Sequence, residues 1–207
     1  MSNNSGAIAP QKWSKTVDDK EMDVFNPDPS LFSVDRIAYV LARINRFAGH
    51  WVFPVSVARH SLEVAKRLRR GGYDVETQLQ GLFHDASEAF TTDIPSPLKR
   101  LLYVLPGDKP YHGGDSFVGY HEFEEGLLRR IFAALEIEYP LRPEVHTADK
   151  RLTEQESSWI RHGASKRSLY RGLSIDPNVV TLAFQQRARG LFEERACNGN
   201  APNGPGV

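Results

Sequence analysis

Residues 79–90 read LQGLFHDASEAF, an apolar helical pattern that one histidine and two carboxylates interrupt. Leucine, phenylalanine and alanine recur there at the spacing of one buried helix face. Burying a carboxylate beside an imidazole is costly unless its charge is compensated, and a metal ion is one way to compensate it. His84 and Glu88 are four residues apart, which would place them on one helix face, with Asp85 about 100° round the axis. We therefore predict that residues 79–90 form a core helix that carries part of a metal site.

Outward from this stretch, apolar residues recur at helical spacing, and no strand pattern is longer than a few residues. A long loop is predicted over residues 106–119, and helices over residues 34–44, 55–70, 98–105, 120–135, 144–162 and 177–196. The polar, glycine- and proline-rich ends at residues 1–12 and 197–207 are predicted to be disordered, which leaves residues 13–196 as one domain. The predicted fold class is all-α, a single-domain helical bundle of six to eight helices with a metal site between helices.

The composition is that of an ordinary globular domain. The 207 residues are 40% hydrophobic and 25% charged, and a net charge of +0 provides no global attraction to nucleic acid or to a membrane surface. The basic run KRLRR at residues 66–70 is interpreted as a solvated helix end, where cations complement the helix dipole. No apolar run approaches the ~20 residues of a membrane span, and the first residues lack a signal-peptide pattern. With Cys197 as the single cysteine, we expect a cytoplasmic protein without nucleic-acid or membrane partners.

A metal site of this kind needs histidine and carboxylate ligands that come from several helices. The candidate ligands lie on three predicted helices and are His60, His84, Asp85 and Asp149. Two imidazoles and two carboxylates form a mixed nitrogen and oxygen donor set. Such a set suits Mn²⁺, Co²⁺, Ni²⁺, Zn²⁺ or Fe²⁺, and Mg²⁺ is an admissible alternative.

The same residues resemble the signature of the HD-domain phosphohydrolases, which is His…His-Asp…Asp on an all-helical fold. The closer resemblance is to the branch that contains bacterial 5′-deoxynucleotidases and phage deoxynucleoside triphosphohydrolases. The segments that carry it run through most of the chain. They are DVFNP at residues 23–27, INRFAGH at 44–50, SVARHS at 56–61, HDASEAFTTDIPSPLK at 84–99 and AD at 148–149.

The resemblance implies a role for each matching residue. It implies that the metal ligands are His60, His84, Asp85 and Asp149. It also implies that Glu88 and Asp93 are catalytic carboxylates, and that Arg46 and Phe47 face the nucleotide. Arg46 and Lys99 are the cations that we expect to meet phosphate, Arg46 with two donors and Lys99 as a point charge. Two positions depart from the 5′-deoxynucleotidases, which have tryptophan in place of Phe47 and glycine in place of Thr92.

The implied activity is metal-dependent hydrolysis of 2′-deoxynucleotides, which are small-molecule substrates. The resemblance also implies that the protein forms a homo-oligomer. Release of phosphate from deoxynucleoside monophosphates is the favoured reaction. The main alternative is a phage-like, dATP-type triphosphohydrolase, for which the additional cations would come from Arg46, Arg59, Lys99 and Arg100. Two further hypotheses are a non-catalytic nucleotide-sensing domain and the hydrolysis of a signalling nucleotide, such as a cyclic dinucleotide or guanosine tetraphosphate.

Overall fold

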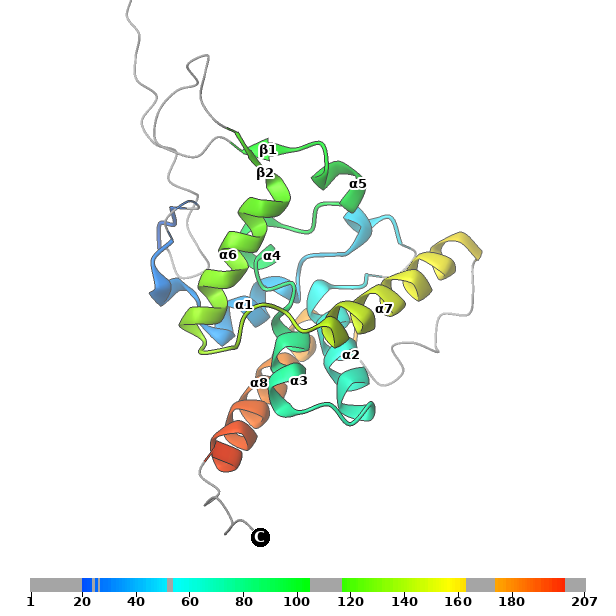
Figure 1. Cartoon of the computed structure of the whole chain (residues 1–207). Helices are drawn as coiled ribbons and strands as arrows, with labels where there is room; N and C mark the ends of the chain where they lie inside the picture. Colours follow the sequence, from blue (N-terminus) through cyan, green and yellow to red (C-terminus); the bar gives the residue numbers. More distant parts are fainter. Residues whose placement is uncertain are drawn as a thin grey trace, which may run out of the picture.

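The computed structural model describes residues 20–23, 25, 27–51, 54–104, 117–162 and 174–199. The predicted disordered start at residues 1–12 and most of the predicted loop at 106–119 therefore lie outside the described residues. Helices make up most of the described chain, and they gather round α2 and α3 (Figure 1). In chain order the elements are η1 (Pro29–Leu31), α1 (Val34–Leu41), η2 (Phe47–Gly49), α2 (Val57–Arg70), α3 (Val75–Phe83), α4 (Glu88–Thr91), α5 (Ser96–Lys99), β1 (Tyr103–Val104), β2 (Val118–Gly119), α6 (Tyr120–Ala134), α7 (Pro143–His162) and α8 (Pro177–Gly199).

The mainly helical class is confirmed for the described residues, and most predicted helix boundaries agree to within three residues. Side chains of Ser33, Ser56 and Asp74 cap α1, α2 and α3, because each accepts a hydrogen bond from a backbone N–H three residues later. Helix α8 continues to Gly199, so residues 197–199 are helical rather than part of a disordered tail. None of the helices in the described part of the chain has the length and apolar character needed to cross a lipid bilayer.

The predicted helix over residues 98–105 is wrong. Helix α5 ends at Lys99, and strand β1 pairs with β2 in an antiparallel ladder that places Tyr103 opposite Gly119 and Val104 opposite Val118. Tyr-Val is a dipeptide that favours strands, and the pairing partner lies 14 residues further along the chain, beyond the reach of a local helical pattern.

The predicted helix over residues 79–90 is interrupted at the residues of interest. Helix α3 ends at Phe83, and α4 begins at Glu88. Between them the backbone N–H of residue i bonds to the carbonyl of residue i−3, as in Ala86 to Phe83 at 2.8 Å and Glu88 to Asp85 at 3.0 Å. This tighter winding advances about 120° per residue, so His84 and Glu88 do not lie on one helix face. Aspartate and serine favour such a change, because their side chains compete with the helical backbone for hydrogen bonds.

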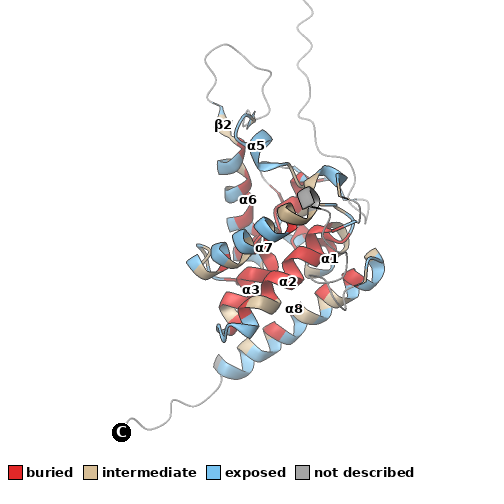
Figure 2. Ribbon diagram, turned by 90° about the vertical axis from the view of Figure 1, so that its right-hand side faces the viewer, coloured by how far each residue is buried: buried red, intermediate tan, exposed pale blue. Residues whose placement is uncertain are grey.

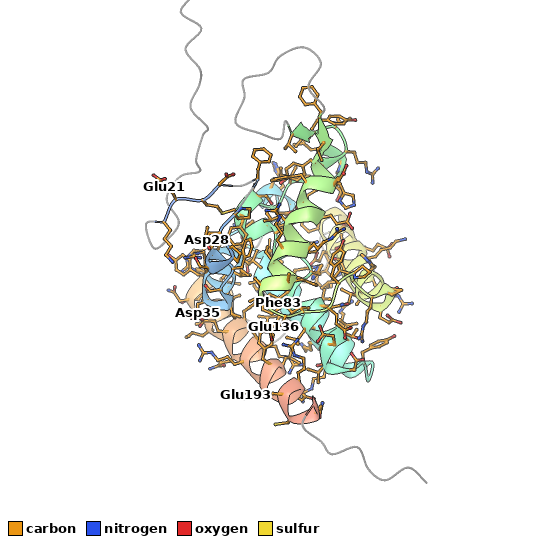
Figure 3. All side chains as sticks on the ribbon, turned by 60° about the vertical axis from the view of Figure 1, so that its left-hand side comes forward. Glu21, Asp28, Asp35, Phe83, Glu136 and Glu193 are labelled. Carbon is orange, nitrogen blue, oxygen red and sulfur yellow. The ribbon has the colours of Figure 1, made fainter. Side chains whose placement is uncertain are left out.

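The main core lies where α1, α2, α3 and α8 pack together, and Figure 2 shows buried residues concentrated on α2 and α3. Helices α2 and α3 approach so closely that a Cβ atom at Gly81 would overlap Leu68 Cδ1. Phe83 is fully buried with its ring 5.3 Å from that of Phe184 on α8, whereas the labelled Glu193 lies on the outer surface (Figure 3). The end of α3 is therefore anchored in the core, and this anchoring positions His84.

A smaller apolar cluster joins α2 to α7. It consists of Val64, Leu68, Val145 and Leu152, and all four side chains are almost completely buried. Because His60 lies on α2 and Asp149 lies on α7, this cluster sets the spacing between those two side chains.

Candidate metal centre

Three helices bring His60, His84 and Asp149 together. His60 comes from α2, His84 is the C-cap residue that follows α3, and Asp149 lies on α7. Asp149 Oδ1 lies 2.9 Å from His60 Nε2 and 3.7 Å from His84 Nε2. One donor atom from each of the three residues lies within 4.8 Å of the others, which is close enough for all three to bind one ion. We call these three residues the histidine cluster.

Asp85 lies at the edge of the histidine cluster. Its Oδ2 atom is 3.2 Å from His84 Nε2 and 3.3 Å from Arg46 Nη1. Burial would raise the pKa of Asp85, but the neighbouring His84 and Arg46 lower it well below its ordinary value. Asp85 is therefore ionised at the edge of the cluster, where its oxygen can serve as a fourth ligand.

The two histidines are held by their Nδ1 atoms, which turns both Nε2 atoms toward the cluster. His84 Nδ1 lies 2.9 Å from the Gly81 carbonyl oxygen, so it must donate a hydrogen there. His60 Nδ1 lies 3.0 Å from Glu156 Oε1. An imidazole that donates from Nδ1 presents a lone pair at Nε2 when it is neutral, and such orientation by a carbonyl or carboxylate is typical of metal-binding histidines.

The cluster attracts positive charge. The Nε2 atom of His84 is buried and makes no well-aligned hydrogen bond with the described residues, although two carboxylate oxygens lie near it. Burial would lower the pKa of His84, but the charge of Asp85 and contacts with Asp149 raise it well above 6.5. Burial would raise the pKa of Asp149, but its contacts with both histidines lower it far below 3.8. A proton or a metal cation would satisfy this arrangement, so the donor set fits a divalent ion.

Glu156 and Thr153 support the centre, although neither residue was predicted from the sequence. They follow Asp149 on α7 by seven and four residues, the spacing of one helix face, which is the signal that could have found them. Glu156 is fully buried and binds His60 through one oxygen and Arg46 Nε, at 3.2 Å, through the other. Thr153 Oγ1 lies 2.9 Å from Arg46 Nη2 and 3.1 Å from Asp149 Oδ1. Arg46 therefore contacts Glu156 and Asp85 directly, and it reaches Asp149 through Thr153.

The segment after α1 places Arg46 beside α2. The Arg46 N–H donates to the Val55 carbonyl at 2.9 Å, next to an isolated bridge between Asn45 and Ser56. The following residue, Phe47, has a positive φ of 57°, a strained conformation for a bulky side chain. Its N–H donates to Asp93 Oδ2 at 3.1 Å. This hydrogen bond connects Arg46 and Phe47, which are predicted to bind substrate, with Asp93, a predicted catalytic acid. The Phe47 ring packs edge-on against Trp51.

A second charged group, which we call the lysine cluster, consists of Glu88, Lys99 and Glu124. Lys99 Nζ lies 3.1 Å from Glu88 Oε1, and 2.8 and 2.9 Å from the two carboxylate oxygens of Glu124. Glu124 was not selected from the sequence. It lies on the buried face of α6 with Tyr120 and Leu127, and an acid on an otherwise apolar helix face is the signal that could have identified it.

Two acids, Glu88 in the lysine cluster and the nearby Asp93, have raised pKa values. Burial and the charge of Asp85 raise the pKa of Glu88 well above 4.5, despite the nearby Lys99. Burial also raises the pKa of Asp93 above 3.8, and Arg46 partly offsets that effect. Glu88 Oε2 is buried and has no hydrogen-bond partner among the described residues. Glu88 therefore holds a proton to a higher pH than an ordinary glutamate does.

Both clusters border one cavity of about 750 Å³. Of the predicted site residues, it is lined by Arg46, His84, Asp85, Glu88, Asp93, Lys99 and Asp149. His60, which is fully buried, and Phe47, which is half-buried, are not among the described residues that line the cavity. Arg59 does not reach the cavity either, and its Nη1 donates to the Pro54 carbonyl at 2.9 Å. Further basic side chains at the lining are those of Arg100, His121, His146 and Lys150.

Comparison with known proteins adds relatives but no activity. No protein-family model matches this chain. The chain is 29% identical over 178 residues to YfdR, an uncharacterized protein of Escherichia coli K12, and the match covers 79% of this chain and 86% of YfdR. It is also 31% identical over 94 residues to an uncharacterized protein of Rhodobacter capsulatus, covering 44% of this chain and 48% of that protein. Its function must therefore be argued from the site.

Proposed function

We propose that this protein is a metal-dependent phosphohydrolase of 2′-deoxynucleotides on an HD-type helical fold, and that it releases phosphate from deoxynucleoside monophosphates. The observation that carries the proposal is the convergence of His60, His84 and Asp149 beside a cavity that also holds Glu88 and Arg46. The resemblance of these positions to the HD-domain signature supports the same activity.

The histidine cluster with Asp85 would hold the metal ion. A divalent cation there would polarise a phosphate oxygen and lower the pKa of water. The mixed nitrogen and oxygen donors favour Mn²⁺, Co²⁺, Ni²⁺, Zn²⁺ or Fe²⁺. Glu156 would keep His60 in the tautomer that presents Nε2, and the Gly81 carbonyl would do the same for His84.

Arg46 is the cation best suited to meet the phosphate. Guanidinium has five N–H donors, and the described contacts of Arg46 with Glu156, Asp85 and Thr153 use one on each nitrogen. Two donors therefore remain for a phosphate oxygen. Lys99 has three donors, and its contacts with Glu88 and Glu124 use all three. Lys99 accordingly orients Glu88 rather than gripping the substrate.

Glu88 would be the general acid in this mechanism. Its raised pKa lets it hold a proton to a higher pH than an ordinary glutamate, and Lys99 holds one oxygen while the other faces no described partner. It can therefore give its proton to the oxygen that leaves the phosphate. Asp93 is anchored to the Phe47 N–H and would accept a proton from attacking water.

The cavity favours a monophosphate over a triphosphate. Arg59, one of the four cations expected to serve a triphosphate, is directed to the Pro54 carbonyl instead. Hydrolysis of a triphosphate would have to use Arg100 and Lys150, which are exposed residues of the cavity lining. This pair keeps a triphosphohydrolase as the second candidate.

A substrate panel tests the proposal. Purified protein is incubated with each deoxynucleoside mono- and triphosphate and with Mn²⁺, Co²⁺, Ni²⁺ or Zn²⁺, and the products are separated by chromatography. We expect deoxynucleosides and phosphate from the monophosphates, and no product from a His84→Ala variant.

The matched control is His146→Ala, because His146 lines the same cavity but is exposed and lies outside the histidine cluster. It should keep its activity. Absence of product with every metal and nucleotide would refute the proposal. Nucleotide-induced thermal stabilisation without turnover would instead indicate a sensing domain.

A further inference from the structure

A second hollow lies between the C-terminal half of α2 and α7, which pack side by side (Figure 1). Its volume is about 820 Å³, and it shares no lining residue with the cavity of the metal centre. A volume of several hundred Å³ is typical of small-molecule sites. We call this hollow the α2–α7 groove.

The groove carries a local excess of positive charge. Four basic side chains (Lys66, Arg67, Arg70 and Arg151) and two acidic ones (Glu63 and Glu144) line it, although the whole chain has a net charge of zero. Glu63 is buried and already paired twice, with Lys66 at 2.9 Å and Arg67 at 3.6 Å. Arg70 and Arg151 make no ion pair with any residue that the structure describes, and neither does Glu144, so the lining keeps an excess of positive charge.

The basic run at the end of α2 could simply complement the helix dipole. Arg151 does not fit that explanation. It lies in the interior of α7, which spans Pro143–His162, and no helix C-terminus requires a cation at that position. Two helices therefore each contribute an unpaired arginine to one groove, and arginine is the side chain that best matches phosphate geometry.

An aromatic ring stands beside these arginines. Tyr73 lines the groove and is 44% exposed. A Cβ atom at Gly71 would come within 2.8 Å of the Tyr73 ring, so the glycine allows the ring to lie against the turn after α2. An exposed tyrosine ring is a stacking surface for a flat aromatic group.

The base of the groove is formed by a residue of the hydrophobic core. Leu68 lines it and belongs to the buried cluster with Val64, Val145 and Leu152 that joins α2 to α7. The lining residues are therefore held on two packed helices, as in a preformed ligand site.

We propose that the α2–α7 groove binds a nucleoside phosphate at a site separate from the metal centre. Arg70 and Arg151 would hold the phosphates, and Tyr73 would stack on the base. This binding does not depend on hydrolysis at the metal centre.

Calorimetric titration with ADP, pyrophosphate and adenosine tests the proposal, with a chelator present so that the metal centre binds no metal. We expect ADP to bind the wild type. Because hydrogen bonds to charged groups are lost, the Arg70→Glu/Arg151→Glu variant should lose about tenfold or more in ADP affinity. Tyr73→Ala should weaken ADP but not pyrophosphate, since only ADP carries a base.

Two control variants keep the test specific. Arg189→Glu removes an exposed arginine from α8, and His84→Ala disrupts the metal centre, so both should bind ADP like the wild type. Circular dichroism checks that each variant is folded. Equal ADP affinity in the double arginine variant, or loss of ADP binding in His84→Ala, would overturn the proposal. Binding of a short DNA duplex without binding of ADP would also overturn it, in favour of a nucleic-acid surface.

Discussion

The histidine cluster and the lysine cluster share one cavity but solve the problem of buried charge differently. In the lysine cluster, the three N–H groups of Lys99 meet three carboxylate oxygens of Glu88 and Glu124. In the histidine cluster, two Nε2 atoms face the Asp149 carboxylate, and the buried Nε2 of His84 has no well-aligned hydrogen bond. One cluster supplies its own cation and the other requires one. Under the proposed function, the histidine cluster would bind the metal and the lysine cluster would transfer protons.

The largest effect is expected on metal affinity when one residue of each cluster is substituted and the two variants are compared. We expect His84→Ala to lower the affinity for Mn²⁺ or Co²⁺ roughly a hundredfold or more, because it removes a ligand rather than one of its outer partners. Lys99→Met should leave metal affinity within a few-fold of the wild type, although activity falls. Calorimetry and metal analysis of the purified variants measure both effects. If Lys99→Met lost the metal as completely as His84→Ala, the division between the clusters would be wrong.

The stability of the folded protein should depend on Lys99, the cation of the lysine cluster. Lys99→Met leaves the buried carboxyl groups of Glu88 and Glu124 facing each other, and breaking a buried ion pair costs about 3–5 kcal/mol. Burial raises the pKa of both acids, so protonation relieves the cost at low pH. The folded variant binds more protons than the unfolded chain above about pH 4.5, so its stability should fall as the pH rises from there.

Denaturant unfolding of the wild type and Lys99→Met between pH 4.5 and pH 8 measures this difference in the metal-free protein. Arg100→Met is the matched control, because Arg100 is the next residue and is exposed. A destabilisation that did not grow with pH would show that lost packing, rather than unpaired carboxylates, explains the Lys99→Met effect.

A smaller effect is expected from the partners that orient the histidine cluster. Glu156→Gln keeps the shape of the side chain but removes the charge that holds His60 and Arg46. We expect metal affinity to fall about tenfold, the lower end for such outer partners. Glu154→Gln, an exposed change on the same helix, should leave metal affinity unchanged. Equal metal affinities in the two variants would mean that His60 needs no carboxylate partner.

The smallest effect belongs to a change outside both clusters. Asp74 caps the first turn of α3, and Asp74→Ala should cost about 1 kcal/mol of stability without changing metal affinity. Hydrogen bonds from Thr77 and Arg142 outweigh burial and lower the Asp74 pKa to about 2. A lowered pKa stabilises the fold above the ordinary value of 3.8, and this contribution is lost as the pH falls toward 2. Thermal unfolding at pH 7 and pH 2.5 should therefore show a larger difference between wild type and variant at pH 7.

Local patterns and the family resemblance were enough to predict most helices and to select all three residues of the histidine cluster and two of the three in the lysine cluster. Capping residues and apolar spacing are properties of a few consecutive residues, so α1, α2, α6, α7 and α8 could be placed from the sequence. The resemblance to the HD-domain signature indicated the candidate ligands and acids, which lie in short segments with unusual composition. The convergence of His60, His84 and Asp149 is then a geometric fact that only packing could establish.

Contacts between distant residues account for what the sequence analysis missed. Glu156 meets His60 across 96 residues of chain, and Glu124 meets Lys99 across 25, distances at which periodicity carries no information. Residue types and spacings could therefore indicate which chemistry was available, whereas the partner of each buried charge was set by helices that pack together in three dimensions.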